Sequence, residues 1–398
     1  MKKLNCIFIG VIFFCFHLSA QDPFFTHYYG NKSSFNPAFT GINSALTVGL
    51  KYRDQWYNEQ ASAFRTANVY LEESVPCFIM DYGFSVLHHQ AGEGDFTRTE
   101  ISGRGAFHLG TVELGKEGFL NGRFGFSATT GQVGLDGNQL VYLDQLDALY
   151  GLNNRENIPN ESAFNLNGVQ QPWYFIPSVG FLIRYISGQG RDSWRLDFSA
   201  AAHNLGLFSG VDARQSASLT GLEYPLETRN IFALSGAFVA KMNNYRVVVQ
   251  PSLMYQRQSS LKYLEGGIDI SFLRDFTFGT HYHFAQLEAS ATNTNWYSFR
   301  VTTGAFFKSR LTNRTSERLE ITAEISVANG GLGNSVRSPI ELGMALHFGG
   351  NSRTCRLFGS PTEKSSLENR RGTPCPVGQV SRGKRKIYDQ IWYSDLLL

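Results

Sequence analysis

The sequence predicts an all-β protein, a transmembrane antiparallel β-barrel of about fourteen strands. The first observation is composition: the 398 residues include 32 Phe, 18 Tyr and 40 Gly, and only 17% are charged, against ~25% in an average soluble domain. The second is a period of two in hydrophobicity, and the third is the length of the periodic segments, which suits tilted membrane strands. The mean hydropathy of -0.21 agrees with this, because apolar outward and polar inward residues average out along a barrel strand.

Residues 1–20 have the three parts of a secretory signal peptide. Lys2 and Lys3 form the basic region, Ile7 to Phe16 form the apolar region, and the small residues before the cleavage site end at Ala20. A membrane anchor is the alternative, but the apolar run is shorter than the roughly 20 residues of a bilayer span. We therefore expect export, with cleavage near Ala20.

The segment 21–43 is unusually aromatic for the start of a mature chain. A fourteen-strand barrel is too wide for wall side chains alone to fill, so we expect this segment to lie along the lumen or at the periplasmic mouth. Its residues with an expected packing or turn role are Tyr28, Tyr29, Phe35, Asn36, Pro37 and Gly41. Deletion of 21–41 should then impair assembly of the barrel.

Residues 44–349 carry the strand pattern. In 46–53, 319–327 and 340–348, apolar side chains alternate with polar or small ones, several of them charged, which argues against a sandwich buried on both sides. The fourteen predicted strands are 44–57, 61–73, 78–90, 96–110, 118–133, 173–187, 193–204, 229–241, 244–258, 261–272, 275–284, 296–309, 317–328 and 338–349.

The lengths of the predicted connections give the barrel a direction. The longest follow predicted strands five, seven, eleven and thirteen, so all of them leave the same end of the barrel: 134–172, 205–228, 285–295 and 329–337. Outer-membrane barrels keep their long loops outside the cell and short turns in the periplasm. The first strand is therefore expected to rise from the periplasm.

Residues 350–398 form a basic tail, with nine Lys and Arg against four Asp and Glu. The run RGKRK at 382–386 has the charge of a nucleic-acid-binding segment, but an exported barrel meets no nucleic acid. We expect a periplasmic tail that contacts an anionic partner or stays soluble.

Three cysteines follow the signal peptide. Cys77 lies in a predicted periplasmic turn, and Cys355 and Cys375 lie in the tail. All three then share an oxidising compartment. We expect a disulfide between Cys355 and Cys375, or one from either of them to Cys77.

Candidate chemistry is sparse in the sequence. His281 and His283 lie on one face of a predicted strand, a spacing that can chelate a metal, but no Cys or acidic ligand lies at motif distance. The run GLDGNQ at 134–139 lacks the later acidic ligands of a calcium loop. We therefore expect polar wall histidines, with no cofactor, no metal and no enzyme activity.

The run QDPFFTHYYGNKSSFNPAFTG at 21–41, directly after a signal peptide, resembles the start of the PorP/SprF family of the type IX secretion system in Bacteroidota. In that family Q-D-P, an aromatic cluster and N-P-A-x-x-G follow one another. The resemblance continues in YRDQW (52–56), HHQAGEG with RTEISG (88–103), PSLMYQRQ (251–258) and SPIELGMALHF (338–348). The insertion 134–172 and the tail from 356 are longer than the family pattern.

The resemblance implies a non-enzymatic outer-membrane barrel, in contact with membrane lipid, that helps to secrete or anchor surface proteins such as gliding adhesins. Its implied partners are type IX secretion components, a large secreted cargo protein and a periplasmic peptidoglycan-associated protein. The residues marked for a structural or partner role are Asp22, Pro23, Tyr28, Tyr29, Asn36, Pro37, Gly41, Arg53 and Trp56. A general porin and an outer-membrane enzyme such as a lipase are the alternatives, and no Ser, His and acid set supports the enzyme.

Overall fold

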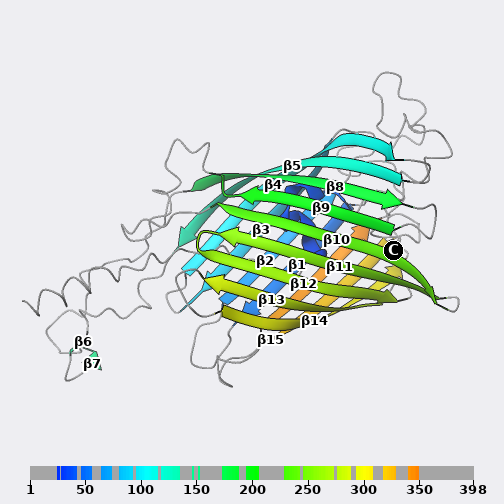
Figure 1. The fold of residues 1–398 in the computed structure, drawn as a ribbon. Coiled ribbons are helices and arrows are strands. Elements are labelled where there is room, and N and C mark those ends of the chain that lie inside the picture. Colours follow the sequence, from blue (N-terminus) through cyan, green and yellow to red (C-terminus); the bar gives the residue numbers. More distant parts are fainter. Residues whose placement is uncertain are drawn as a thin grey trace, which may run out of the picture.

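Fourteen antiparallel strands form a closed barrel in the computed structural model (Figure 1). Each strand pairs with its neighbours along the chain, and β1 closes the barrel by pairing with β16, with Leu46 opposite Phe348. The predicted barrel and its strand number are confirmed. The barrel strands are β1 (Leu46–Gln55), β2 (Phe64–Glu73), β3 (Met80–Ala91), β4 (Phe96–Leu114), β5 (Gly118–Gly134), β8 (Tyr174–Ser187), β9 (Trp194–His203), β10 (Arg229–Met242), β11 (Tyr245–Gln258), β12 (Leu261–Phe272), β13 (Phe276–Leu287), β14 (Asn293–Phe307), β15 (Glu317–Ala328) and β16 (Ile340–Phe348).

The structure describes residues 25–26, 28–42, 46–55, 64–73, 80–92, 96–114, 118–134, 146–147, 151–152, 173–187, 194–205, 228–242, 245–272, 276–287, 293–307, 317–328 and 339–348. The expected signal peptide at residues 1–20, the three cysteines that follow it (Cys77, Cys355 and Cys375) and the basic tail therefore lie outside the described residues. In the described part of the chain, no helix is both long enough and apolar enough to cross a membrane.

Strand β4 is longer than the sequence predicts. It continues to Leu114 rather than ending at residue 110. Gly110 has a positive φ of 130°, and the pairing with β5 shifts register between His108 and Gly110. The glycine therefore marks a β-bulge inside a strand and not the turn that ends it. A short ladder of β6 (Leu146–Asp147) and β7 (Gly151–Leu152), inside the predicted insertion, was also not foreseen.

The strands place apolar side chains outside and polar side chains inside. On β1, Val48 and Leu50 are exposed, while Thr47 before them and Lys51 after them are buried. The same inversion recurs on β15, where Ile321 and Ile325 are exposed and Thr322 and Glu324 are buried. This pattern is the reverse of a soluble protein and fits a barrel whose outer surface faces lipid.

The apolar core lies inside the barrel, around the residues that precede β1. This part of the chain forms η1 (Tyr29–Asn31), α2 (Lys32–Phe35) and η2 (Pro37–Phe39), drawn in blue within the barrel in Figure 1. Its buried members are Phe25, Tyr28, Phe35, Ala38, Phe39 and Ile42, and they pack against wall residues such as Leu182, Ile231 and Met254. The residues that precede β1 thus occupy part of the lumen of their own barrel.

Candidate functional site

The candidate site is the contact between the polar inner wall and the residues that fill the lumen, which we call the lumen segment (Phe25, Thr26 and 28–42). Tyr28 packs at its centre, with ring centroids 5.6 Å from Phe35 and 6.1 Å from Phe39. Burial raises the pKa of the Tyr28 hydroxyl above its ordinary value, so this group is neutral in the lumen.

Asn36 joins the lumen segment to the barrel wall. Its Nδ2 donates to the backbone oxygens of Phe181 and Ala200, at 3.0 Å each, and these two residues are directly paired between β8 and β9. Its Oδ1 accepts a hydrogen bond from the backbone N of Ala38 at 2.8 Å and so caps η2. Pro37 takes the first position of that helix, where its missing N–H forgoes no bond.

Two wall glycines make room for this turn. Gly125 of β5 and Gly180 of β8 are directly paired. A Cβ on Gly125 would lie 2.1 Å from the backbone N of Ala38, and a Cβ on Gly180 would lie 1.9 Å from Asn36 Oδ1. Both distances are shorter than any tolerated contact, so only glycine permits this approach of the lumen segment.

The end of the lumen segment is held by β2, β3 and β5. Gly41 has a φ of 69°, and a Cβ there would lie 2.7 Å from Asp81 Cβ. Its N–H donates to Glu72 Oε2 at 3.3 Å. Arg123 donates to the backbone oxygen of Thr40 at 2.7 Å and forms an ion pair with Asp81. A left-handed glycine and a buried ion pair therefore fix the entry into β1.

The middle of the lumen segment contacts β2 and β4. The Ser33 hydroxyl is hydrogen-bonded to Glu72 and accepts a bond of 3.0 Å from Arg104. The Tyr70 hydroxyl donates to the backbone oxygen of Gly30 at 3.1 Å. Side chains of the wall thus form hydrogen bonds with a hydroxyl group of α2 and with a backbone oxygen of η1, which precedes it.

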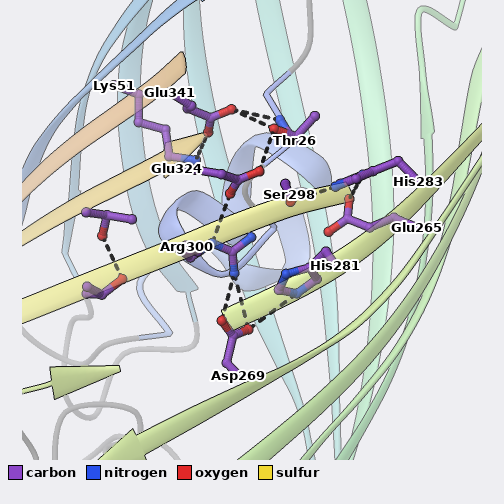
Figure 2. A network of polar contacts seen from close by, with 12 residues as sticks. Thr26, Lys51, Glu265, Asp269, His281, His283, Ser298, Arg300, Glu324 and Glu341 are labelled. Carbon is purple, nitrogen blue, oxygen red and sulfur yellow. Dashed lines mark hydrogen bonds and ion pairs between the residues drawn. The ribbon is translucent and has the colours of Figure 1, made fainter. Parts of the chain in front are cut away.

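Thr26, at the other end, binds two wall carboxylates (Figure 2). Its backbone N donates to Glu341 Oε2 at 2.9 Å, and its hydroxyl lies 3.0 Å from oxygens of both Glu324 and Glu341. Lys51 forms an ion pair with Glu341 at 3.5 Å, and its Nζ lies 5.1 Å from the ring centroid of Phe25. The carboxylates of β15 and β16 therefore hold both the segment and a buried cation.

Arg300 connects the carboxylates of the wall. It donates from Nε to Glu324 Oε2 at 3.0 Å and from Nη1 to both oxygens of Asp269 at 3.1 and 3.2 Å. These residues come from β14, β15 and β12, and Figure 2 shows them converging inside the barrel. All three are almost fully buried. A buried guanidinium between two carboxylates is stable only as a complete set.

His281 and His283 lie on the lumen face of β13, side by side as their spacing predicts. His283 lies 2.7 Å from the hydroxyls of both Tyr263 and Ser298, and His281 lies 3.5 Å from Asp269. Among the described residues, no group of three or more His, Cys, Asp or Glu is placed to hold a metal ion. The two histidines belong to the polar wall network.

The structure brings together some of the residues that the sequence marks. Tyr28, Asn36, Pro37 and Gly41 all belong to the lumen segment and are in contact with the wall. Arg53 is buried on the lumen side of β1, paired in register with Glu341. Tyr29 begins η1. Asp22, Pro23, Trp56, Cys355 and Cys375 lie outside the described residues.

Sequence reasoning missed the wall partners of these residues. Gly125 and Gly180 interrupt otherwise regular strands, and an interior strand glycine is a signal of close backbone approach. Glu324 and Glu341 are charged members of the alternating segments 319–327 and 340–348, and the alternation alone predicts only that they face the lumen. Their role depends on a contact with Thr26, which is 315 positions away from Glu341 in the chain.

Comparison with known proteins gives one family. A sequence model of the family described as "Type IX secretion system membrane protein PorP/SprF" matches residues 17–328. No curated protein matches the chain.

Solved structures with a similar fold are outer-membrane proteins of low similarity. The monoaromatic hydrocarbon channel CymD is 12% identical with a TM-score of 0.34 and covers 80% of this chain and 92% of its own. The toluene transporter TodX of Pseudomonas putida is 10% identical with a TM-score of 0.36, over 80% and 92%. CdiB of Acinetobacter baumannii is 6% identical with a TM-score of 0.37, over 76% and 60%. These scores are too low to carry an argument about function.

Proposed function

Since the chain belongs to the PorP/SprF family of type IX secretion system membrane proteins, we propose that it is a non-enzymatic outer-membrane barrel that assists the secretion or surface anchoring of specific cargo proteins such as adhesins. The family and the barrel fold are those of a secretion protein of the outer membrane. The selection of cargo and the lack of catalysis go beyond the family match and the fold, and both are proposed here.

The observation that carries the proposal is the occupied lumen. Thr26 binds β15 and β16, Asn36 binds β8 and β9, and Gly41 binds β2. The lumen segment therefore crosses the barrel and is tied to the wall at three separate places. A wall that satisfies the backbone and hydroxyl groups of a polypeptide is suited to hold a chain, whereas a general solute channel requires an open lumen.

The proposed partners lie at the two ends of the barrel. The longest connections leave the end opposite to the start of β1, and long loops of outer-membrane barrels face outside, so we assign the large cargo protein and other type IX secretion components to that end. A periplasmic peptidoglycan-associated protein is assigned to the opposite end. The basic residues of 350–398 supply a charge that an anionic partner there would match.

A deletion strain tests the proposal. We expect loss of one or a few specific adhesins from the cell surface, with unchanged uptake of small solutes, and restoration by the wild-type gene. Impaired uptake of many small solutes with a normal set of surface proteins would contradict the proposal.

The porin alternative makes the opposite prediction in vitro. The purified wild-type protein in planar lipid bilayers should give no steady open-channel current, because the lumen segment occupies the barrel. Steady currents of a constant unit size would favour the general porin and count against a secretion accessory.

A further inference from the structure

A polar cavity of about 90 Å³ lies between the lumen segment and the barrel wall. Residues 33–35 of the segment line one side of it. On the wall, His203 and Arg229 line it, and these are the last residue of β9 and the first residue of β10, so the cavity lies toward the end of the barrel where the connection between these strands begins and ends. At about 10–15 Å³ for each water-sized group, it has room for roughly six to nine of them. The cavity therefore suits one small molecule and not a folded domain.

Two buried amides that line this cavity lack hydrogen-bond partners. Gln256 of β11 and Asn68 of β2 are each only 1% exposed. Within the described part of the chain, Gln256 Nε2 and Oε1 and Asn68 Oδ1 make no hydrogen bond. Buried amide groups are nearly always hydrogen-bonded in native proteins. The cavity therefore offers one donor and two acceptors to the molecule that occupies it.

These three atoms select a ligand that can donate hydrogen bonds. The oxygens of Gln256 and Asn68 only accept, and an ionised carboxylate on the ligand also only accepts. Such a ligand would leave both amide oxygens without a bond. A hydroxyl group both donates and accepts, so a ligand with neighbouring hydroxyls satisfies the two oxygens and Gln256 Nε2 together.

The charged residues of the lining are already engaged with the protein. Arg98 forms an ion pair with Glu100, which also lines the cavity. Arg104 Nη1 lies 3.9 Å from Glu72 Oε1, and Arg229 has an interaction of its own as well. The arginines therefore give no reason to expect an anion, and a neutral ligand leaves their interactions intact.

Apolar residues complete the lining. They are Phe25 and Phe35 of the lumen segment and Leu87 and Ile176 of the wall. Apolar side chains gain from contact with the C–H groups of a ligand, whereas water offers them no such contact. A sugar ring has C–H faces and hydroxyl groups around its edge, so one molecule matches both the apolar and the polar part of this lining.

We propose that this cavity binds a neutral sugar, one hexose unit in size, with neighbouring hydroxyls on Gln256 and Asn68 and a C–H face toward the apolar residues. The proposal does not rest on the secretion role, and each can fail without the other.

Saturation-transfer NMR tests the proposal on the full folded protein, in micelles of a detergent without a sugar head group. The probes are D-glucose, D-galactose and D-mannose, each used separately. We expect saturable binding of at least one of them, with a dissociation constant of about 1 mM or tighter. Binding should be at least about tenfold weaker for tetrahydropyran, which has the ring without the hydroxyls, and for acetate, which only accepts hydrogen bonds.

Two results with the wild-type protein would overturn the proposal. If none of the three sugars bound, the cavity would hold water only. If tetrahydropyran or acetate bound as tightly as the best sugar, the hydroxyl groups would not be what the cavity recognises.

Gln256→Met separates a ligand-binding amide from a structural one. The change keeps a long side chain but removes a donor and an acceptor that bond no group of the described protein. It should therefore leave the stability of the barrel at or above the wild-type value and weaken sugar binding about tenfold or more. Asn68→Ala should weaken binding in the same direction without any change on β11.

Gln258→Met is the matched control for Gln256→Met. Gln258 is also buried on β11 but does not line the cavity, and it has a partner in the protein. Its replacement should lower stability, measured as the temperature at which the barrel loses its compact gel mobility, and leave sugar binding unchanged. Wild-type binding by Gln256→Met would refute the assignment, and so would losses of binding or of stability that are equal in the two variants.

Discussion

Gly125 of β5 and Gly180 of β8 lie directly opposite each other in the barrel wall, and the lumen segment occupies the space that their side chains would fill, with the backbone of Ala38 at Gly125 and the side chain of Asn36 at Gly180. Because neither residue has a side chain, the pair leaves a recess in the wall, and the turn that begins at Asn36 lies in it. Through it the wall holds the segment by shape, in addition to the hydrogen bonds of Asn36.

Alanine at either glycine should displace the lumen segment. Gly125→Ala places a methyl group against the backbone of Ala38, and overpacking of this kind costs about 1–3 kcal/mol. We expect the folded barrel to lose its compact gel mobility at a lower temperature than the wild type. Gly103→Ala on β4 is the control, because a Cβ there would meet only the Phe84 ring at 3.9 Å. If both variants lost compact gel mobility at the same temperature, the lumen segment would not require a glycine at position 125.

Removal of the Asn36 amide should release the turn. Asn36→Ala loses the bonds to Phe181, Ala200 and Ala38, and at about 1 kcal/mol for each bond the unfolding free energy should fall by about 3 kcal/mol. Asn36→Asp keeps the cap on Ala38 but sets a carboxylate against two carbonyl oxygens, so it should not restore stability. Chemical unfolding followed by tryptophan fluorescence measures both variants. Full stability of Asn36→Asp would show that the wall carbonyls contribute nothing.

Loss of Arg300 should be costly because it leaves two buried carboxylates unpaired. Breaking such a set typically costs about 3–5 kcal/mol, so Arg300→Met should sharply lower the unfolding free energy. The triple variant with Asp269→Asn and Glu324→Gln removes the unpaired charges and should recover part of the loss. A triple variant no more stable than Arg300→Met would argue against the electrostatic explanation.

Deletion of 21–41 should impair assembly of the barrel. The deletion removes five of the six segment residues in the lumen core, leaving Ile42, and exposes the wall carboxylates that bind Thr26. The yield of heat-modifiable protein in outer-membrane fractions measures the effect. Replacement of 21–41 by a polar linker of the same length separates lost contacts from lost length. Wild-type yield from both variants would mean that the segment is dispensable.

The cysteines of the tail remain a prediction. Peptide mass spectrometry with and without reduction should find Cys355 linked to Cys375, or one of them linked to Cys77. Three free thiols in protein from the native envelope would contradict the expectation.

The barrel could be predicted from the sequence because the inner and outer faces of its wall differ so much in polarity. The pattern of Val48 and Leu50 against Lys51 is local, and fourteen repeats of it gave the correct strand number. Strand ends were harder, since Gly110 resembles a turn residue but forms a bulge that two neighbouring strands determine. An isolated sequence does not show which strand lies beside a glycine.

For the lumen segment, the local turn could be predicted from the sequence, but its contacts with the wall could not. Asn36 and Pro37 form a local cap, so their turn is encoded within a few residues. Gly125, Gly180 and Glu341 meet the segment only once the barrel has closed. Their contacts span much of the chain, and nothing periodic in the sequence distinguishes them from other wall residues.

The bonds of Thr26 to Glu324 and Glu341 have a consequence for biogenesis. They join the first described part of the chain to its final hairpin, so they form only after nearly the whole barrel has been synthesised. Because β1 also pairs with β16, closing the seam and seating Thr26 involve the same last strands. A barrel truncated before β15 lacks both Glu324 and Glu341, so Thr26 then has neither of its two carboxylate partners.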